Sequence, residues 1–461
     1  MHLPRLHPAA QAAALAVSVL LAACGGGGDD DPPSQRGAIL SGHLAGHADA
    51  AVIDAGTQAS GLQALSGPAR CSVDVRYVMY VTRDPAGQPA TASAGVLVPQ
   101  GEDAACQGER PVVLYAHGTT TARSKNMADV VNDTEASLVM AMFAAQGYIV
   151  VAPNYLGYDR SSLTWHPYLN AEAQATDMID ALRAAKAHLN EQSPVKPSQH
   201  LFITGYSQGG HVAMATHREI QTRYADEFTV TASGPMSGPY NLLQFAQVIN
   251  GPGPINAGAT IFTPMLLTSY QRSYGNVYRA PAEVYQAPYA ATAETLFPTD
   301  TPVADLVAQG RLPADPTFTA LFGPGGLLTD AFRNDFLTNP DNGFVQALER
   351  NTLLGWTPTR PMALCGGAED PTVFYGVNTP VAQADFNSRL PAQLAVPAFD
   401  LEDRSTLPAG QAGDQIYGGF QLAKNAAGSD VLAQYHGGLV PPFCTALIRG
   451  FFEQVMQQSN Q

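Results

Sequence analysis

The sequence feature that most constrains the fold is an alternation of short apolar runs with longer amphipathic segments between residues 111 and 238. The expected strands are PVVLYAHG (111–118), YIVVAPN (148–154), HLFITGYS (200–207) and FTVTASGPMSG (228–238), and the expected helices cover 135–147, 172–189 and 208–224. Strands that are apolar throughout and separated by helices form parallel sheets that are covered on both faces. The chain is therefore predicted to be an α/β protein with a mostly parallel central sheet.

An alternating run precedes this region and predicts a β-hairpin. The segment CSVDVRYVMYVT (71–82) turns at 84–87 and returns as ATASAGVLVP (90–99). Such a hairpin brings residues near 71 and 100 together, and Cys106 lies just beyond. Of the three pairings that four cysteines allow, we therefore expect Cys71 with Cys106, which leaves Cys365 with Cys444. The alternative is four buried free thiols.

The N-terminus predicts export. Arg5 precedes an apolar stretch (9–23) that is shorter than the roughly 20 residues a membrane span needs, so residues 1–23 are interpreted as a signal peptide. The ending LAAC resembles a bacterial lipobox, which implies lipidation of Cys24 and a lipid-anchored, flexible tether over 24–37. Gly25 resembles the outer-membrane sorting signal, so we expect a cell-envelope lipoprotein of the outer membrane. The alternative is ordinary secretion after cleavage at an alanine.

The charge balance excludes one class of partner. Lysine and arginine number 24 against 39 aspartates and glutamates, and they form no basic patch. Nucleic-acid binding proteins concentrate positive charge on one face. No nucleic-acid partner is expected.

The pentapeptide Gly205-Tyr206-Ser207-Gln208-Gly209 stands where an expected strand meets an expected helix. This G-x-S-x-G pattern in this context is typical of a nucleophile held on a strained turn, with small flanking residues that permit tight packing. Ser207 is therefore the candidate nucleophile. The alternative is a glycine-rich helix start that Ser207 caps.

A serine nucleophile needs a base, and in the α/β-hydrolases, which this G-x-S-x-G turn resembles, the acid and then the histidine follow the serine in the chain. Only His211, His217 and His436 follow Ser207. His211 and His217 lie on the helix that the serine opens, and we interpret both as structural. His436 lies in AQYHGGLVPPFC, where two glycines predict a loop tip before an apolar helix, so His436 is the candidate base. The alternative is a surface loop histidine.

The candidate acid is Asp370, in the loop AEDPTV after the expected strand RPMALCGG (360–367). Neighbouring residues cannot both point inward, and Asp370 is preferred to Glu369. The alternative is that Asp370 only initiates a turn with Pro371. The reserve candidates for the acid are then the carboxylates that follow the start of the strand VPAFDL (396–401): Asp400, Glu402 and Asp403. A Cys365–Cys444 disulfide would join the segments that carry the acid and the base.

The oxyanion hole should use the backbone N–H of Gln208, which follows the nucleophile, and one from the loop His117-Gly118-Thr119. Thr119 is the candidate second donor, and Gly118 permits the turn. The alternative is a plain glycine turn.

A long insertion is predicted to form a largely helical cap over 238–358, between core segments 38–237 and 359–461. Residues 249–258 (INGPGPINAG) are a candidate hinge. The cap aromatics either contact an acyl chain or pack the core of the cap: Tyr270, Tyr274 and Tyr278, at helical spacing, then Phe297, Phe318 and Phe322.

Together these segments resemble the α/β-hydrolase superfamily and, within it, the secretory lipase family. The resemblance rests on YAHGTT, VVAPNYLGYDRSS with HPYL, ITGYSQGGHV, CGGAEDPTVF and YHGGL. It implies hydrolysis of carboxylic esters through an acyl-enzyme, without metal or cofactor, and we expect small to medium or lipidic esters outside the cytoplasm as substrates. Asp159 and His166 belong to the matching block, and we interpret both as structural, organising the loop beside the nucleophile.

Three other functions remain open from the sequence. A serine peptidase or a polyester depolymerase of the same fold would keep the same Ser-His-Asp set and differ in the cap. A catalytically silent lipoprotein that binds a partner at the cell surface is a different class, and the complete Ser, acid, His series argues against it.

Overall fold

The computed structural model describes residues 36–251 and 253–459. The expected signal peptide, the lipidation site Cys24 and most of the expected tether lie outside the described residues, as does Pro252 of the candidate hinge. Within these bounds, no helix combines the length and the apolar character that crossing a membrane requires.

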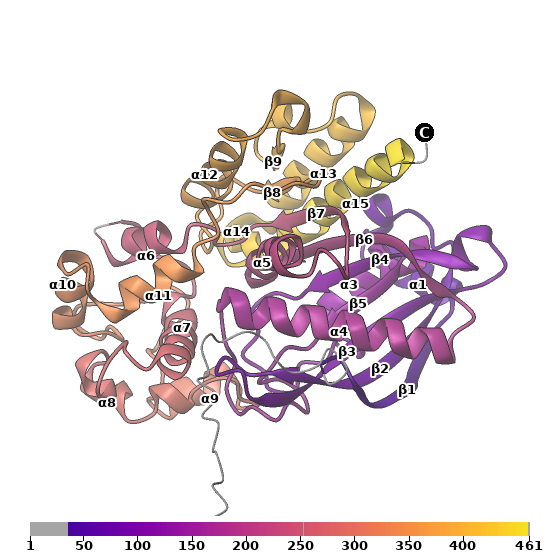
Figure 1. Ribbon diagram of the computed structural model, residues 1–461. Coiled ribbons are helices and arrows are strands. Elements are labelled where there is room, and N and C mark those ends of the chain that lie inside the picture. Colours follow the sequence, from indigo (N-terminus) through magenta and orange to yellow (C-terminus); the bar gives the residue numbers. More distant parts are fainter. Residues whose placement is uncertain (1–35, 252, 460–461) are drawn as a thin grey trace, which may run out of the picture.

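The centre of the described structure is a nine-stranded sheet in the order β1-β2-β3-β5-β4-β6-β7-β8-β9 (Figure 1). Pairing is antiparallel from β1 to β5 across β2 and β3, and parallel from β5 to β9. The strands are β1 (Ile39–Ala48), β2 (Ser72–Arg83), β3 (Pro89–Gln100), β4 (Glu109–Ala116), β5 (Ile149–Pro153), β6 (Lys196–Tyr206), β7 (Val230–Met236), β8 (Leu364–Gly366) and β9 (Ala398–Asp400). The α/β prediction is confirmed.

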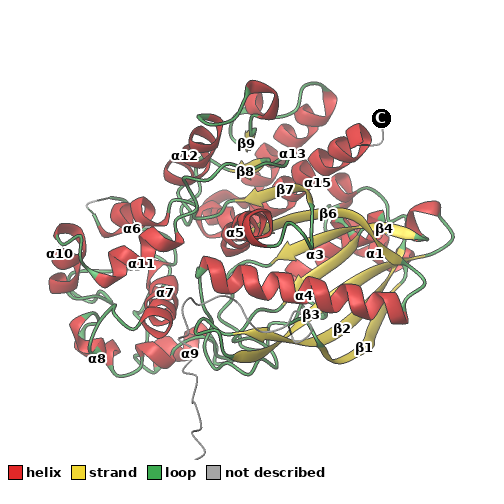
Figure 2. Ribbon diagram, viewed as in Figure 1, coloured by secondary structure: helices red, strands yellow, loops and turns green. Residues whose placement is uncertain are grey.

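Helices cover both faces of this sheet (Figure 2). One face packs against α4 (Ala171–Gln192) and α5 (Gln208–Arg223), and side chains of both helices join the strands in one apolar cluster. The other face packs against α3 (Thr134–Met142), α13 (Gln411–Ala427) and α15 (Val440–Ser459) in a second cluster. The central strands are apolar on both sides because both sides are buried.

The sequence pattern did not reveal the first elements of the chain. Strand β1 pairs with β2 at the sheet edge and is followed by α1 (Ala50–Ala59) and α2 (Gln63–Ser66). Most side chains of β1 are exposed. An edge strand with little buried surface leaves no alternation of polar and apolar residues to detect.

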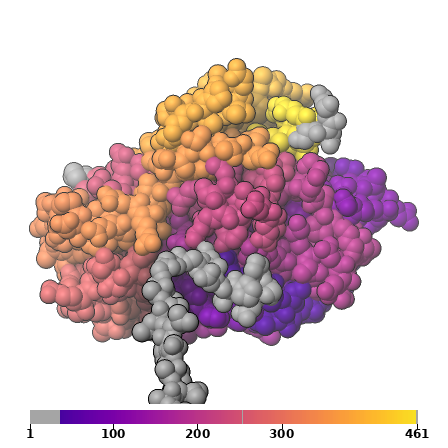
Figure 3. Space-filling model, viewed as in Figure 1, coloured from indigo at the N-terminus to yellow at the C-terminus, as the bar shows by residue number. Residues whose placement is uncertain are grey.

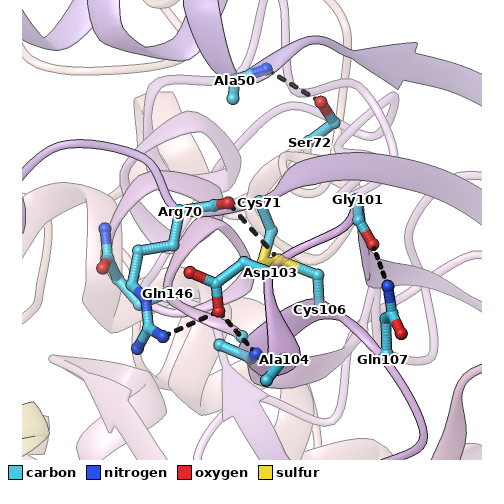
Figure 4. Close-up of a disulfide and its surroundings, with 12 residues drawn as sticks. Ala50, Arg70, Cys71, Ser72, Gly101, Asp103, Ala104, Cys106, Gln107 and Gln146 are labelled. Atoms are coloured by element: carbon cyan, nitrogen blue, oxygen red, sulfur yellow. Dashed lines mark hydrogen bonds and ion pairs between the residues drawn. A yellow bond between two sulfur atoms is a disulfide. The ribbon is translucent and has the colours of Figure 1, made fainter.

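Both expected disulfides are present. Cys71 and Cys106 are joined where the β2–β3 hairpin meets the turn before β4, and Asp103 beside them accepts hydrogen bonds from Arg70 and from the Ala105 N–H (Figure 4). Cys365 in β8 is joined to Cys444 in α15.

The insertion after β7 is helical and has its own apolar core. Its helices lie beside the sheet in Figure 1 and form a separate lobe on one flank in Figure 3: α6 (Leu242–Asn250), α7 (Ala259–Tyr274), α8 (Ala287–Ala290), α9 (Val303–Ala308), α10 (Asp330–Thr338) and α11 (Gly343–Asn351). One expectation is wrong: Tyr278 does not share a helix with Tyr270 and Tyr274. Gly275 ends α7 with a positive φ of 74°, which stops the helix before Tyr278.

Candidate active site

Ser207 occupies the turn between β6 and α5 in a strained conformation. Its φ of 61° and ψ of −120° lie outside the regions that residues with a side chain usually adopt. A Cβ atom at Gly205 or at Gly209 would overlap the carbonyl oxygen of Ala116 at the end of β4. The two glycines of the motif are therefore needed because the turn is pressed against the neighbouring strand, and this fixes where the Ser207 hydroxyl points.

The structure brings Ser207, His436 and Asp370 together in one chain of hydrogen bonds. His436 Nε2 lies 2.7 Å from Ser207 Oγ, and His436 Nδ1 lies 2.6 Å from Asp370 Oδ2. A carboxylate can only accept, so Nδ1–H donates to Asp370 and leaves Nε2 free to accept from the Ser207 hydroxyl. This is the geometry that a general base requires.

The predicted loop tip at His436 is wrong. His436 lies on a π-helical turn (Tyr435–Leu439) that joins α14 (Val431–Gln434) to α15. Gly437 and Gly438 lower helix propensity locally, but Tyr435 and Leu439 on the same turn are buried in the core, and that packing overrides the propensity. A π-helical turn adds a residue to the helical repeat, which is a common way to aim a side chain at a functional site.

Asp370 is held rigidly in the loop after β8. It is 4% exposed, and its Oδ1 accepts hydrogen bonds from the N–H groups of Thr372 and Val373, at 2.8 and 3.0 Å. The second oxygen, Oδ2, is the one that faces His436. Glu369 points the other way, to an ion pair with Lys424.

The three reserve carboxylates are engaged elsewhere. Asp400 accepts from the N–H groups of Ala368 and Glu402, and burial raises its pKa. Asp403 accepts from Ser405. Hydrogen bonds from Lys424, Tyr435 and Gln421 outweigh the effect of burial on Glu402 and hold its pKa below the usual range. Lys424 also pairs with Glu369, so Lys424 and Glu402 link the loop that carries Asp370 to the turn that carries His436.

Tyr206 is a site residue that sequence reasoning missed. Its hydroxyl donates to the backbone carbonyl of His436 at 2.5 Å and lies 3.4 Å from His436 Nδ1. Tyr206 is buried, so the strand that carries the nucleophile also holds the turn that carries the histidine. Position x of G-x-S-x-G accepts many residue types, and the sequence therefore gave no signal for this contact.

The two expected oxyanion donors come from two different segments, the start of α5 after Ser207 and the loop after β4. Gln208 is the first residue of α5, where backbone N–H groups have no partner within the helix. The Gly118 N–H donates to Glu135 Oε1 at 2.9 Å, which leaves Thr119 as the next N–H along that loop. The Thr119 hydroxyl is in turn hydrogen-bonded to Tyr168 at 2.9 Å. Both residues border a cavity that reaches Ser207.

His166 and Asp159 fix the loop beside the nucleophile, as expected. Burial lowers the pKa of His166 to about 3, so the ring is neutral; Nδ1–H donates to the Leu156 carbonyl and Nε2 accepts from the Gln208 side chain. Asp159 accepts from the hydroxyls of Tyr77 and Ser93.

His211 and His217 are structural, as expected. His211 Nε2 donates to the Asn351 carbonyl at 2.8 Å, and His217 Nδ1 is hydrogen-bonded to Ser233 at 2.7 Å. Both rings are buried, and burial lowers the pKa of His211 to about 4 and that of His217 to about 3.

Two cavities meet at Ser207. The first, which we name the cap chamber, is an apolar space of about 80 Å³ enclosed mainly by α6, α7 and α11. The second, which we name the open groove, has a volume of about 2090 Å³ and runs between α1, α3, α13 and α15. Thr119, Ser207 and Phe262 border both.

The cap aromatics singled out in the sequence are not the ones that line the cap chamber. Among the described residues, the aromatic walls of the chamber are Tyr168, Phe245, Phe262 and Phe344. The six from the sequence belong to or pack against the core of the cap, apart from Phe318, which is exposed. Helical spacing identifies a buried face but does not say whether a cavity or a neighbouring helix covers it.

The fold and this site define the chain as an α/β-hydrolase, and comparisons with known proteins agree. The model of the prolyl oligopeptidase family matches residues 134–233. The esterase LipA of Xanthomonas oryzae, described as degrading the rice cell wall, is 32% identical over 87% of this chain and 97% of its own, with a TM-score of 0.71.

The chain therefore belongs to the α/β-hydrolase superfamily and, within it, to the esterase and lipase family that includes LipA. Lipase A of Candida antarctica shares the fold alone, at 12% identity over 79% of this chain and 76% of its own, with a TM-score of 0.52. No curated protein sequence matches the chain.

Proposed function

We propose that the protein is a serine carboxylic-ester hydrolase in which Ser207 is the nucleophile, His436 the general base and Asp370 the residue that orients His436. The single observation that carries this proposal is the unbroken hydrogen-bond chain from Ser207 Oγ through the imidazole to Asp370 Oδ2. The strained turn at Ser207 supports it, because such strain persists where function needs it.

The reaction follows from this geometry. His436 Nε2 takes the Ser207 proton as Oγ attacks the ester carbonyl, and the imidazolium is stabilised by the Asp370 carboxylate. The N–H groups of Gln208 and Thr119 stabilise the oxyanion. His436 then protonates the departing alcohol, and water repeats the sequence on the acyl-enzyme to release the acid.

A panel of substrates tests the proposal. Esters of p-nitrophenol should be hydrolysed with burst kinetics, and Ser207→Ala should lower kcat by up to about 10⁶-fold, as for nucleophile loss in other triad enzymes. A Ser207→Ala protein that keeps substantial esterase activity would overturn it. A folded wild type that is inactive on every ester and amide would favour the silent binding protein.

A peptidase is the second candidate, because the prolyl oligopeptidase model matches the segment that contains Ser207. Peptide p-nitroanilides assayed beside the esters separate the two functions. A kcat/KM for amides that equals or exceeds that for esters would favour the peptidase. Hydrolysis of insoluble polyester in preference to soluble esters would favour the depolymerase.

We also propose that the mature protein is exported and anchored in the outer membrane through a lipid on Cys24. Two disulfides in the described part of the chain support export, since such bonds persist in oxidising compartments. Metabolic labelling with palmitate should mark the wild type, and Cys24→Ser should abolish the label. An unlabelled wild type with a free mature N-terminus would support ordinary secretion instead.

A further inference from the structure

We propose that the open groove binds the alcohol portion of the ester and that this portion is an uncharged alcohol with a long alkyl chain, whereas the cap chamber takes a short acyl group. This inference rests on the proposed function, because it assigns the two sides of the bond that Ser207 cleaves.

The cavity that binds the alcohol and the cavity that binds the acyl group are assigned from the positions of two residues, the proton donor His436 and the oxyanion donor Gln208. His436 lines the open groove and not the cap chamber, whereas Gln208 lines the cap chamber and not the open groove. The residue that protonates the leaving oxygen must lie beside the alcohol as the carbon–oxygen bond breaks. The alcohol therefore departs into the open groove, and the acyl chain lies on the opposite side of Ser207, in the cap chamber.

The sizes of the cavities set the two chain lengths. A volume of 80 Å³ corresponds to roughly three water-sized groups at about 30 Å³ each, and a methylene is close to water in size, so the chamber suits an acyl chain of a few carbons. The open groove is more than twenty times larger, at 2090 Å³. Phe262 borders both spaces, and its ring lies against Gly258 at the start of α7. Phe262 thus separates the short compartment from the long one.

The groove walls favour an alkyl chain over a sugar or an anionic alcohol. Its sides are formed by apolar side chains from helices α1, α3, α13 and α15, such as Ile53, Leu138, Ile416 and Phe451. Three of the large apolar residues that the protein leaves exposed line this groove: Val52, Val131 and Leu422. The polar lining includes the carboxylates of Asp49, Asp129 and Glu135, which disfavour an anionic alcohol.

Two ester series test the proposal. With butyrate as the fixed acid, kcat/KM should rise from ethyl to hexyl to dodecyl butyrate, by up to about fourfold for each methylene that becomes buried. With ethanol as the fixed alcohol, kcat/KM should fall from butyrate to octanoate to laurate. All esters are assayed below the concentration at which they aggregate. The opposite pair of trends, or a preference for 6-O-butyryl glucose over dodecyl butyrate, would overturn the proposal.

Matched surface variants locate the effect in the groove. Leu422 is 72% exposed and lines the groove, whereas Leu432 is 56% exposed and does not line it. Leu422→Asp should lower kcat/KM for dodecyl butyrate by at least tenfold more than for ethyl butyrate, and Leu432→Asp should change neither. Equal effects of the two variants on dodecyl butyrate would overturn the proposal.

Substitution of Phe262, the residue between the two cavities, provides an independent readout. Phe262→Ala should join the two spaces and raise kcat/KM for ethyl octanoate relative to ethyl butyrate. An unchanged ratio in a folded variant would refute the role of Phe262.

If activity persists in Ser207→Ala, the proposed function itself fails. If activity depends on Ser207 but the chain-length trends are reversed, only this inference fails.

Discussion

The two disulfides offer a test in which one bond serves as the control for the other. Cys365–Cys444 closes a sequence separation of 79 residues, and Cys71–Cys106 closes one of 35. The chain-entropy relation then gives losses in the free energy of unfolding of roughly 4.5 and 3.8 kcal/mol when each bond is removed. Cys365→Ala/Cys444→Ala and Cys71→Ala/Cys106→Ala should therefore be destabilised to a similar extent.

The two variants should differ in activity because the bonds lie in different places. Cys365 is the middle residue of β8, the strand before the Asp370 loop, and Cys444 lies on the helix that continues from the His436 turn. Without that bond, the distance between Asp370 and His436 is less tightly fixed. We expect kcat to fall by about tenfold or more, since a misplacement of about 1 Å can lower the rate by up to roughly 100-fold. The Cys71–Cys106 bond lies beside the hairpin, so its loss should leave kcat within about twofold.

The assay combines urea unfolding with ester hydrolysis at a temperature where circular dichroism shows both variants to be folded. Activity is expressed per folded molecule, so that stability and alignment are measured separately. Equal losses of kcat in the two variants, or none in Cys365→Ala/Cys444→Ala, would refute the view that this bond aligns Asp370 with His436.

The catalytic triad, the His436 turn and two buried titratable groups each predict a measurable effect of substitution. Asp370→Asn should lower kcat by roughly 10⁴-fold while the fold is retained, because an amide that donates to Nδ1 favours the wrong imidazole tautomer; a loss below tenfold would move the acid elsewhere. Tyr206→Phe should lower kcat with little change in KM, because the His436 turn loses its hydrogen bond, whereas unchanged kinetics would make the contact structural only. His217 has a folded pKa of about 3 against an ordinary 6.5, so stability is lost as the pH falls below about 6.5, by about 2 kcal/mol at pH 5; urea unfolding at pH 7 and 5 should show that loss reduced in His217→Gln. Asp177 is buried on α4, where it accepts hydrogen bonds from the Tyr80 hydroxyl and the Leu156 N–H. Burial raises its pKa to about 7, so its contribution to stability is lost as the pH rises from about 4 to 7, and Asp177→Asn should gain stability relative to wild type over that range; parallel profiles would contradict this.

The core of the fold was predictable because its signals are local. The apolar runs that became β4, β5, β6 and β7 are bounded by helices with clear periodicity, and the order of Ser207, Asp370 and His436 along the chain restricted the candidates. The cysteine pairing followed from the hairpin. These inferences needed only neighbouring residues or chain order.

The parts that were missed depend on tertiary packing. The π-helical turn at His436 forms against local glycine propensity because Tyr435 and Leu439 are buried. The Tyr206 contact joins residues 230 positions apart, and no sequence pattern encodes that direction. Which cap aromatics face the chamber was likewise set by how α6, α7 and α11 meet, rather than by spacing within one helix.

The central claim is that Ser207 is a nucleophile activated by His436, and covalent labelling tests it most directly. The wild type is treated with a fluorophosphonate, and the adduct is counted by intact mass and located by peptide mapping. We predict one adduct per molecule on Ser207, no adduct in Ser207→Ala and a rate of labelling reduced at least 10³-fold in His436→Ala. A label on another residue, or labelling of His436→Ala at the wild-type rate, would contradict the claim.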